Sequence, residues 1–220
     1  MIYKLPKWIE YGAFVLAFVA GCINAIGLLG FEHQAVSHLS GTATLLGTSM
    51  VSNSFETALH LAAILLTFFL GAALSGFLLH GSTLRLGRHY DTLLVIESLL
   101  IFLAFYLLSI GSYYGHLVAS AACGTQNALA TTYGGAILRT THLTGIFTDL
   151  GLMFGSLLRG EPLDKRKAIL FLLIICGFIS GGVIGAYLFG HFQFQALLAP
   201  AGICLMLAGV YRVYTEKHIE

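Results

Sequence analysis

A ten-residue stretch occurs twice in this chain, and the duplication limits the folds that the chain can adopt. The first copy is His38–Gly47 (HLSGTATLLG) and the second is His142–Gly151 (HLTGIFTDLG). Histidine, a hydroxyl residue, glycine, threonine and a final glycine recur at the same spacing. Asn-Ala pairs lie upstream of both copies, at Asn24 and Asn127. Such similarity predicts a fold built from two related repeats.

Composition places the chain in a membrane. Of its 220 residues, 57% are hydrophobic and only 10% are charged, and the mean hydropathy is +0.87. Soluble domains have about 25% charged residues, so the composition excludes a soluble globular protein and predicts a polytopic membrane protein whose main partner is the lipid bilayer. The net charge of +1 gives no reason to expect nucleic acid.

Apolar segments set the predicted number of crossings. Six of them have about the 20 residues that a membrane-spanning helix needs: 11–30, 57–80, 91–111, 115–134, 167–190 and 194–212. Two shorter segments, 39–51 and 143–158, contain the duplicated stretch. At about 1.5 Å per residue the first of these reaches only part of the way across the hydrocarbon core.

The distribution of basic residues indicates whether the short segments cross. If they do not, all 11 Lys and Arg residues fall on the cytoplasmic side, as the positive-inside rule requires. If they do, Arg85, Arg88 and Arg139 move outside. We therefore expect six transmembrane helices and two re-entrant half-helices in the bacterial inner membrane, with both termini cytoplasmic.

This topology predicts an all-α inverted repeat within a single membrane domain, 1–220. Repeat A comprises 11–111 and repeat B comprises 115–212, and Ser75-Gly76 in the first matches Ser180-Gly181 in the second. Each repeat holds three spans, an odd number, so the second repeat enters the membrane inverted. In such folds the irregular segments meet near the midplane, where solute sites lie.

The start of each short segment is the predicted solute site. Ser40 and Thr144 are expected to cap the half-helices, and Gly41 and Gly145 allow close approach of the backbone to whatever lies in front. Free N–H groups and the positive end of the helix dipole favour an anion or a carboxylate. Capping of the helix alone is the alternative interpretation.

Amides within the apolar helices are further candidates. Asn24 and Asn127, the latter preceded by Gln126, need hydrogen-bond partners because burying an unbonded amide costs a few kcal/mol. We expect the partner to be the opposing half-helix or a solute. Amides also tie membrane helices together, so a purely structural role stays open.

Histidines and carboxylates are the candidates for protonation. His38 and His142 are the only histidines related by the duplication, and a structural hydrogen bond, a proton-linked role and a metal site are the alternatives. No third ligand stands at a useful spacing, so no metal is predicted. Asp149 replaces Leu45 of the first copy, and Glu97 lies in the span 91–111. Intramembrane carboxylates often carry protons or cations, and an interfacial position is the alternative for Glu97.

The remaining polar and special residues are predicted to be structural. The four cysteines lie in apolar runs without a C-x-x-C pair, so they indicate packing. Pro200 lies within the last predicted span and is expected to kink it. No cofactor is predicted.

Four segments resemble a known family. They are Phe18–Ala25 (FVAGCINA), the His-Leu-Ser-Gly run at His38, Cys123–Ala128 (CGTQNA) and Arg139–Gly145 (RTTHLTG). They are similar to the YoaK-like family of bacterial inner-membrane proteins, a domain-of-unknown-function family. The family more often has Asp at the position of Asn24, and Thr-Gly-Asn in place of Ser40-Gly41-Thr42. The resemblance implies a location and a topology but no substrate, and the departure at Asn24 puts ion coupling there in doubt.

These features favour a small-solute secondary transporter or channel. The expected solute-binding residues are Asn24, His38, Ser40, Gly41, Thr44, Gln126, Asn127, His142, Thr144, Gly145 and Thr148. The expected coupling residues are Asp149 and Glu97. A membrane scaffold protein is the first alternative, and an intramembrane enzyme using His142 and Asp149 is the second. No nucleophile and base stand together, so no enzyme is predicted, and the glycine-rich helix faces are compatible with a homodimer.

Overall fold

The eight apolar segments are all helices. The computed structural model describes residues 8–30, 36–52, 54–79, 89–133 and 140–218. The helices are α1 (Trp8–Gly30), α2 (Leu39–Val51), α3 (Phe55–Leu78), α4 (Tyr90–Ser109), α5 (Tyr114–Tyr133), α6 (Leu143–Leu158), α7 (Lys165–Phe192) and α8 (Leu198–His218). Within these ranges the chain contains no strand, so the all-α prediction is confirmed for the described residues.

The start of the last helix differs from the prediction. A short 3₁₀ helix, η2 (Gln193–Leu197), separates α7 from α8, and Gln193 has a φ of 52°. This left-handed residue ends α7 and turns the chain. Pro200 then lies in the first turn of α8, where its missing N–H is not needed. The predicted kink at Pro200 is therefore wrong.

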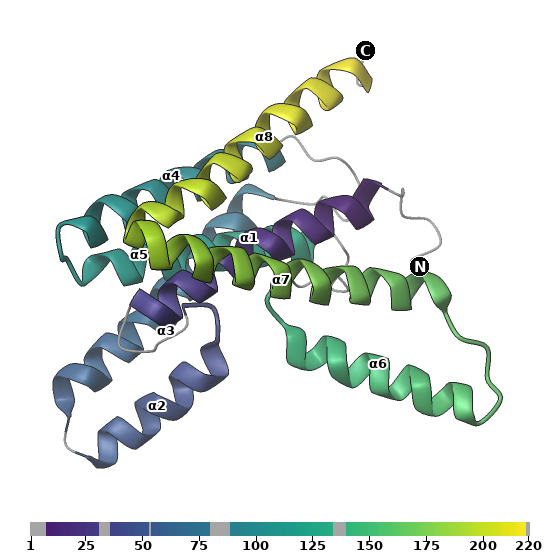
Figure 1. Cartoon of the computed structure of the whole chain (residues 1–220), viewed down its shortest axis with the longest axis horizontal. Helices are drawn as coiled ribbons and strands as arrows, with labels where there is room; N and C mark the ends of the chain where they lie inside the picture. The colour runs from purple at the N-terminus through teal and green to yellow at the C-terminus, as the bar shows by residue number, and fades with distance from the viewer. Residues whose placement is uncertain (1–7, 31–35, 53, 80–88, 134–139, 219–220) are drawn as a thin grey trace.

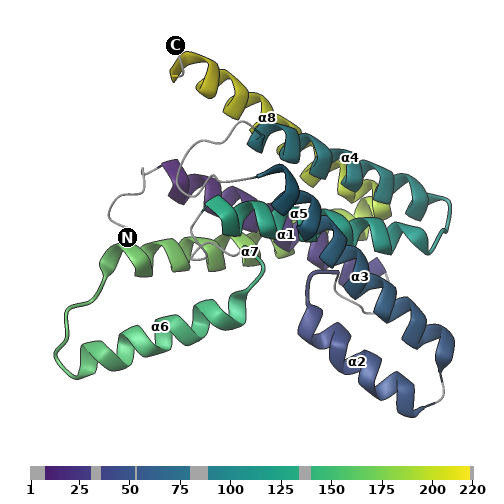
Figure 2. The ribbon, with the colours of Figure 1, turned by 180° about the vertical axis from the view of Figure 1, so that it is seen from behind.

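The helices form a central bundle with two outlying arms. Figure 1 and Figure 2 show α1 and α7 running side by side through the middle, with α4 and α8 along one edge. Helices α3 and α5 pack together in the same bundle. The short helices α2 and α6 begin near the centre and diverge below the bundle, one to each side, and the chain returns from each into the helix that follows.

Among the described residues, four stretches are long and apolar enough to cross a membrane: Glu10–Gly30, Phe55–Leu78, Tyr90–Ser109 and Lys165–Glu216. The last has 52 residues and contains both α7 and α8. Helix α5 is not among them, because amides and hydroxyls such as Gln126 and Thr125 lower its hydropathy. The described part of the chain therefore has four candidate spans, where the sequence predicts six crossings.

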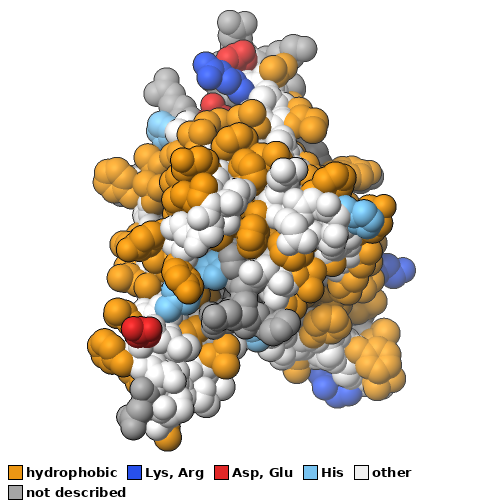
Figure 3. All heavy atoms as spheres, turned by 60° about the vertical axis from the view of Figure 1, so that its left-hand side comes forward, with side chains coloured by type: hydrophobic (Ala, Val, Ile, Leu, Met, Phe, Trp, Pro, Cys, Tyr) orange, Lys and Arg blue, Asp and Glu red, His pale blue; other side chains and the backbone are white. Residues whose placement is uncertain are grey.

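The outer surface agrees with a membrane-embedded protein. Many large hydrophobic side chains are exposed, including Phe69, Phe77 and Leu152. Figure 3 shows hydrophobic side chains over most of one face, with few charged ones among them. A soluble protein rarely exposes so large an apolar area. An apolar surface of this kind is stable in contact with lipid.

Close backbone contacts hold the bundle together. A Cβ atom on Gly21 of α1 would collide with the carbonyl oxygen of Phe178 of α7, and one on Gly124 of α5 would collide with that of Phe68 of α3. Only glycine allows two helix backbones to approach so closely. The α1–α7 pair and the α3–α5 pair therefore use the same device.

A second contact also occurs in both pairs. Gly181 lies against the carbonyl of Phe18 in the α1–α7 pair, and Gly71 lies against the carbonyl of Ala121 in the α3–α5 pair. The two contacts of one pair are therefore spaced along their helices as the two contacts of the other pair are, so α3 corresponds to α7 and α5 to α1 in a single register. By the same register, Gly185 of α7, which lies against Cys22 of α1, corresponds to Ser75 of α3.

This register differs from the one expected from the Ser-Gly pairs. Ser75 Oγ donates to the carbonyl of Thr125 at 2.8 Å, in the place that Gly185 takes against Cys22. Ser180 therefore does not correspond to Ser75. The shift arises because α6 has 16 residues and α2 has 13, and because six residues join α6 to α7 whereas three join α2 to α3.

Candidate functional site

Helices α2 and α6 begin in the same way. α2 starts directly after His38 and α6 directly after His142. In each case the imidazole folds over the first turn, so that a Cβ atom on Gly41 would collide with Nδ1 of His38, and one on Gly145 with Nδ1 of His142. The two glycines are therefore needed to make room for the imidazoles. Sequence reasoning expected them to make room for a solute.

Neither short helix is capped by a side chain at its first residue. The N-cap residues are His38 and His142, and neither makes a side-chain cap hydrogen bond. Ser40 lies inside α2 with its Oγ 3.3 Å from Nε2 of His38. The prediction that Ser40 and Thr144 cap the helices is wrong, because both helices begin before these residues. The first N–H groups of each helix thus lack an intrahelical acceptor.

The asparagines anchor the segments that lead into the short helices. Oδ1 of Asn24 accepts hydrogen bonds from Ser37 N at 3.2 Å and from Ser37 Oγ at 2.8 Å. Oδ1 of Asn127 accepts one from Thr141 Oγ1 at 3.1 Å. Each asparagine therefore binds the residue before the histidine of its own half. The expectation that the opposing half-helix is the partner is wrong.

The neighbouring amide has a different role. Gln126 is fully buried, and its Nε2 donates to the backbone carbonyl of Leu16 at 2.8 Å. The contact joins α5 of the second half to α1 of the first. Gln126 Oε1 makes no hydrogen bond in the described part of the chain.

The threonine hydroxyls of the short helices bond to their own backbone. Thr44 Oγ1 donates to the carbonyl of Ser40 and Thr148 Oγ1 to that of Thr144, both at 2.9 Å. These four residues are exposed. None of the three cavities described below is lined by a residue of the predicted solute site.

The two carboxylates lie in contrasting surroundings. Asp149 of α6 is partly exposed, and its Oδ2 lies 3.5 Å from Nζ of Lys167 on α7. Glu97 of α4 is fully buried beside the thiols of Cys123 and Cys204. Its side chain points into the bundle, and its depth in the membrane stays a prediction.

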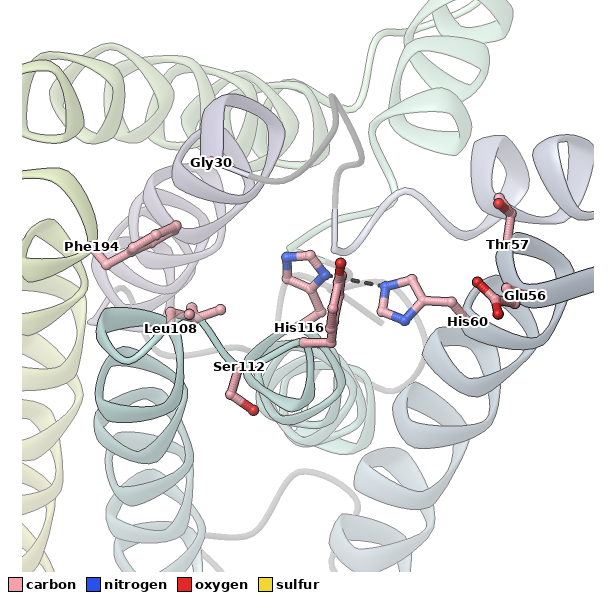
Figure 4. A pocket seen from close by; sticks show the side chains of 10 residues that line it. Gly30, Glu56, Thr57, His60, Leu108, Ser112, His116 and Phe194 are labelled. Carbon is pink, nitrogen blue, oxygen red and sulfur yellow. Dashed lines mark hydrogen bonds between the residues drawn. The ribbon is translucent and has the colours of Figure 1, made fainter. Parts of the chain in front are cut away.

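A cavity of about 580 Å³ lies at one end of the bundle. α1 and α4 end there, and α3 and α5 begin there. Figure 4 shows His60 of α3 and His116 of α5 facing each other in its wall, with His60 Nε2 3.2 Å from His116 Nδ1. The ring centroids are 5.3 Å apart. The other described residues that line it are Gly30, Glu56, Thr57, Leu108, Gly111, Ser112, Tyr113 and Phe194.

Sequence reasoning missed this histidine pair. His60 and His116 are far apart in the chain and occupy unrelated positions in the two copies. The available signal was that each is a titratable residue at the start of an apolar helix. The described residues contain no group of three His, Cys, Asp or Glu side chains that could hold a metal ion.

Two further cavities are described. One, of about 370 Å³, is almost wholly apolar and lies between α1, α4, α5 and α8. The other, of about 320 Å³, lies between α2 and α3. Neither gathers charged side chains, so the histidine cavity is the polar one of the three.

Comparison with known proteins identifies a family. Residues 12–210 match the family described as "Protein of unknown function (DUF1275)". No curated protein and no solved structure matches the chain. The narrower resemblance to YoaK-like proteins stays a prediction. Because the match covers nearly the whole helical bundle, the chain belongs to the DUF1275 family of uncharacterised proteins.

Proposed function

We propose that this protein is a small-solute secondary transporter or channel of the bacterial inner membrane, without enzymatic activity. Its proposed topology has six crossing helices and two re-entrant helices, α2 and α6, arranged as an inverted repeat. The matched contacts of Gly21 with Phe178 and Gly124 with Phe68 support two related halves. Inverted repeats with short broken elements are typical of secondary transporters.

The observation that carries the proposal is the matched pair of helix starts. α2 and α6 both begin near the centre of the molecule and diverge to either side of it (Figure 1). Each start has an imidazole folded on a glycine, and an asparagine that fixes the preceding residue. Uncapped N–H groups at two such starts favour a solute with a carboxylate or another anionic group.

The positions of the helix ends support the proposed orientation. The starts of α1 and α7 and the end of α8 lie towards one side of the molecule, and the α4–α5 and α7–α8 turns lie towards the other (Figure 1). Arg159, Arg166 and Arg212 belong to the first side. This side is cytoplasmic in our proposal, because basic residues concentrate there.

Solute movement can be tested by solid-supported membrane electrophysiology on proteoliposomes. Jumps of sodium acetate, sodium phosphate and sodium chloride test anionic solutes, and ammonium chloride and glycerol, the latter with a swelling assay, test cationic and neutral ones. The test variants are Gly41→Val and Gly145→Val, which displace the imidazoles. The matched controls are Gly47→Val and Gly151→Val, where an added side chain meets open space.

We expect an anion-dependent signal that the test variants lose and the controls keep. Equal signals in all four variants would remove the helix starts from the proposal. Labelling of single cysteines at Ser54 and Glu161 tests the topology: Ser54 should react only from outside and Glu161 only from inside. Reaction of both from the inside would mean that α2 and α6 cross the membrane.

A further inference from the structure

We infer that the His60–His116 pair is a proton-binding site that controls the contact between α3 and α5 at the cavity end of the bundle. When both rings are neutral, or when only one of them is protonated, the two imidazoles share a hydrogen bond and hold the helices together. With both rings fully protonated, the bond is lost and the helices separate. The proton binding stands by itself; its coupling to solute movement rests on the proposed function.

The other half of the molecule provides the comparison. The glycine contacts make Phe68 correspond to Phe178 and Gly124 to Gly21. His60 precedes Phe68 in α3 by the same number of residues as Leu170 precedes Phe178 in α7, so His60 corresponds to Leu170. By the same count along α5 and α1, His116 corresponds to Ala13.

The corresponding pair is buried and apolar. Ala13 and Leu170 are both buried and belong to one hydrophobic cluster with Phe171 and Ile174. The fold therefore accepts a hydrophobic pair at this position. Two imidazoles in the equivalent place of the other half are not needed to close a helix contact, and they face a cavity instead.

The geometry makes the histidine contact depend on protonation. His60 Nε2 and His116 Nδ1 are 3.2 Å apart, so one nitrogen donates and the other accepts. A doubly protonated imidazole has no acceptor nitrogen. When both rings are protonated, two donors and two positive charges face each other, and the contact becomes repulsive. Imidazoles ordinarily titrate near pH 6.5.

The titratable groups around the histidine pair are one carboxylate and one phenol. Glu56, on the first turn of α3, and Tyr113, just before α5, are the other titratable residues that line the described cavity. α1, α4 and η2 contribute Gly30, Leu108 and Phe194, which carry no charge. No lysine or arginine is among the described lining residues. The site thus has a carboxylate that stabilises added positive charge.

The separation of α3 from α5 can be measured directly. Spin labels at Phe55→Cys and Tyr114→Cys, both exposed first residues of their helices, are placed in the full chain after replacement of its four cysteines. Double electron–electron resonance is recorded in nanodiscs between pH 8 and pH 4. We expect the distances to lengthen as the pH falls, at a pH below the ordinary imidazole value of about 6.5, because the second proton enters beside a positive charge.

Two variants test whether the histidines cause the change. His60→Leu with His116→Ala recreates the Leu170–Ala13 pair, and His60→Gln keeps a hydrogen-bonding side chain that does not titrate. Both should keep the short distance at every pH. An unchanged distance in the parent protein, or a pH-dependent one in either variant, would overturn the inference. Failure of all solute transport with the distance change intact would overturn the proposed function alone.

Discussion

The α1–α7 and α3–α5 pairs are built alike in the middle and differently at the end. Both bring helix backbones together over glycines, Gly21 in one and Gly124 in the other. At the end of the α1–α7 pair, Arg166 Nε lies 3.0 Å from Glu10 Oε1 in a half-buried ion pair. By the shared register, Glu56 of α3 corresponds to Arg166 of α7.

By the same register, Tyr113 corresponds to Glu10. No ion pair can form between Glu56 and Tyr113, because neither side chain carries a positive charge. Those two residues line the histidine cavity instead. Two halves with one backbone arrangement thus close one end with a salt bridge and apolar packing and leave the other hollow. Backbone packing fixes how the helices cross, whereas side chains at their ends decide which end is closed.

The largest expected effect tests the shared middle. Gly21→Leu and Gly124→Leu should each destabilise the protein by about 3 kcal/mol or prevent folding, because a side chain collides with a facing carbonyl. Thermal unfolding in detergent measures this. Gly12→Leu, where the added Cβ meets open space, should change stability by less than about 0.5 kcal/mol. A mild effect at only one of the two glycines would break the equivalence of the pairs.

The next effect tests the ends. Glu10→Gln or Arg166→Gln should lower stability by about 1–2 kcal/mol, between the values for exposed and buried ion pairs, because the pair is half-buried. Glu56→Gln, at the matching position of the cavity end, should change it by less than about 0.5 kcal/mol. A double-mutant cycle on Glu10 and Arg166 isolates the pair energy. Equal losses for Glu10→Gln and Glu56→Gln would contradict the proposed difference between the ends.

A smaller effect compares the two asparagines. Asn24→Ala removes two hydrogen bonds to Ser37, and Asn127→Ala removes one to Thr141. At about 1 kcal/mol for each net hydrogen bond, the first variant should be the less stable by about that amount. Chemical unfolding of both variants, with Thr131→Ala as an α5 control, gives the difference. A larger loss for Asn127→Ala would mean that α6 depends on its anchor more than α2 does.

The smallest expected effect concerns the carboxylate that only one copy has. Asp149→Asn removes the ion pair with Lys167, which is partly exposed and 3.5 Å long. It should change stability by about 0.5 kcal/mol or less. If Asp149 couples an ion to transport, the variant should instead lose the pH dependence of the electrophysiological signal. A signal with unchanged pH dependence would leave Asp149 as an anchor between α6 and α7.

Much of the fold could be predicted from local sequence. The bounds of α2 and α6, 39–51 and 143–158, agree with the structure, because apolar runs that end at polar and glycine-containing turns form helices with few alternatives. The start of α8 was misplaced because the turn at Gln193 depends on one backbone conformation. Apolar residues on both sides of that turn conceal it from hydropathy.

The candidate sites were predicted less completely. The paired occurrence of His38 with Gly41, and of His142 with Gly145, correctly marked two helix starts. The glycines were predicted to make room for a solute, but the space in front of each one is occupied by the imidazole of its own segment. The anchors of Asn24 and Asn127 were misassigned, since a sequence does not say which nearby hydroxyl an amide will reach.

The sequence by itself determined that this chain is a set of apolar helices, and it predicted two related repeats. Hydropathy and duplication are local properties, and in lipid a helix satisfies its backbone without help from its neighbours. Only the tertiary structure decided that His60 meets His116, that Glu97 is buried, and that Glu10 meets Arg166. These contacts depend on which helix faces meet and in what register, and close glycine packing between distant helices sets both.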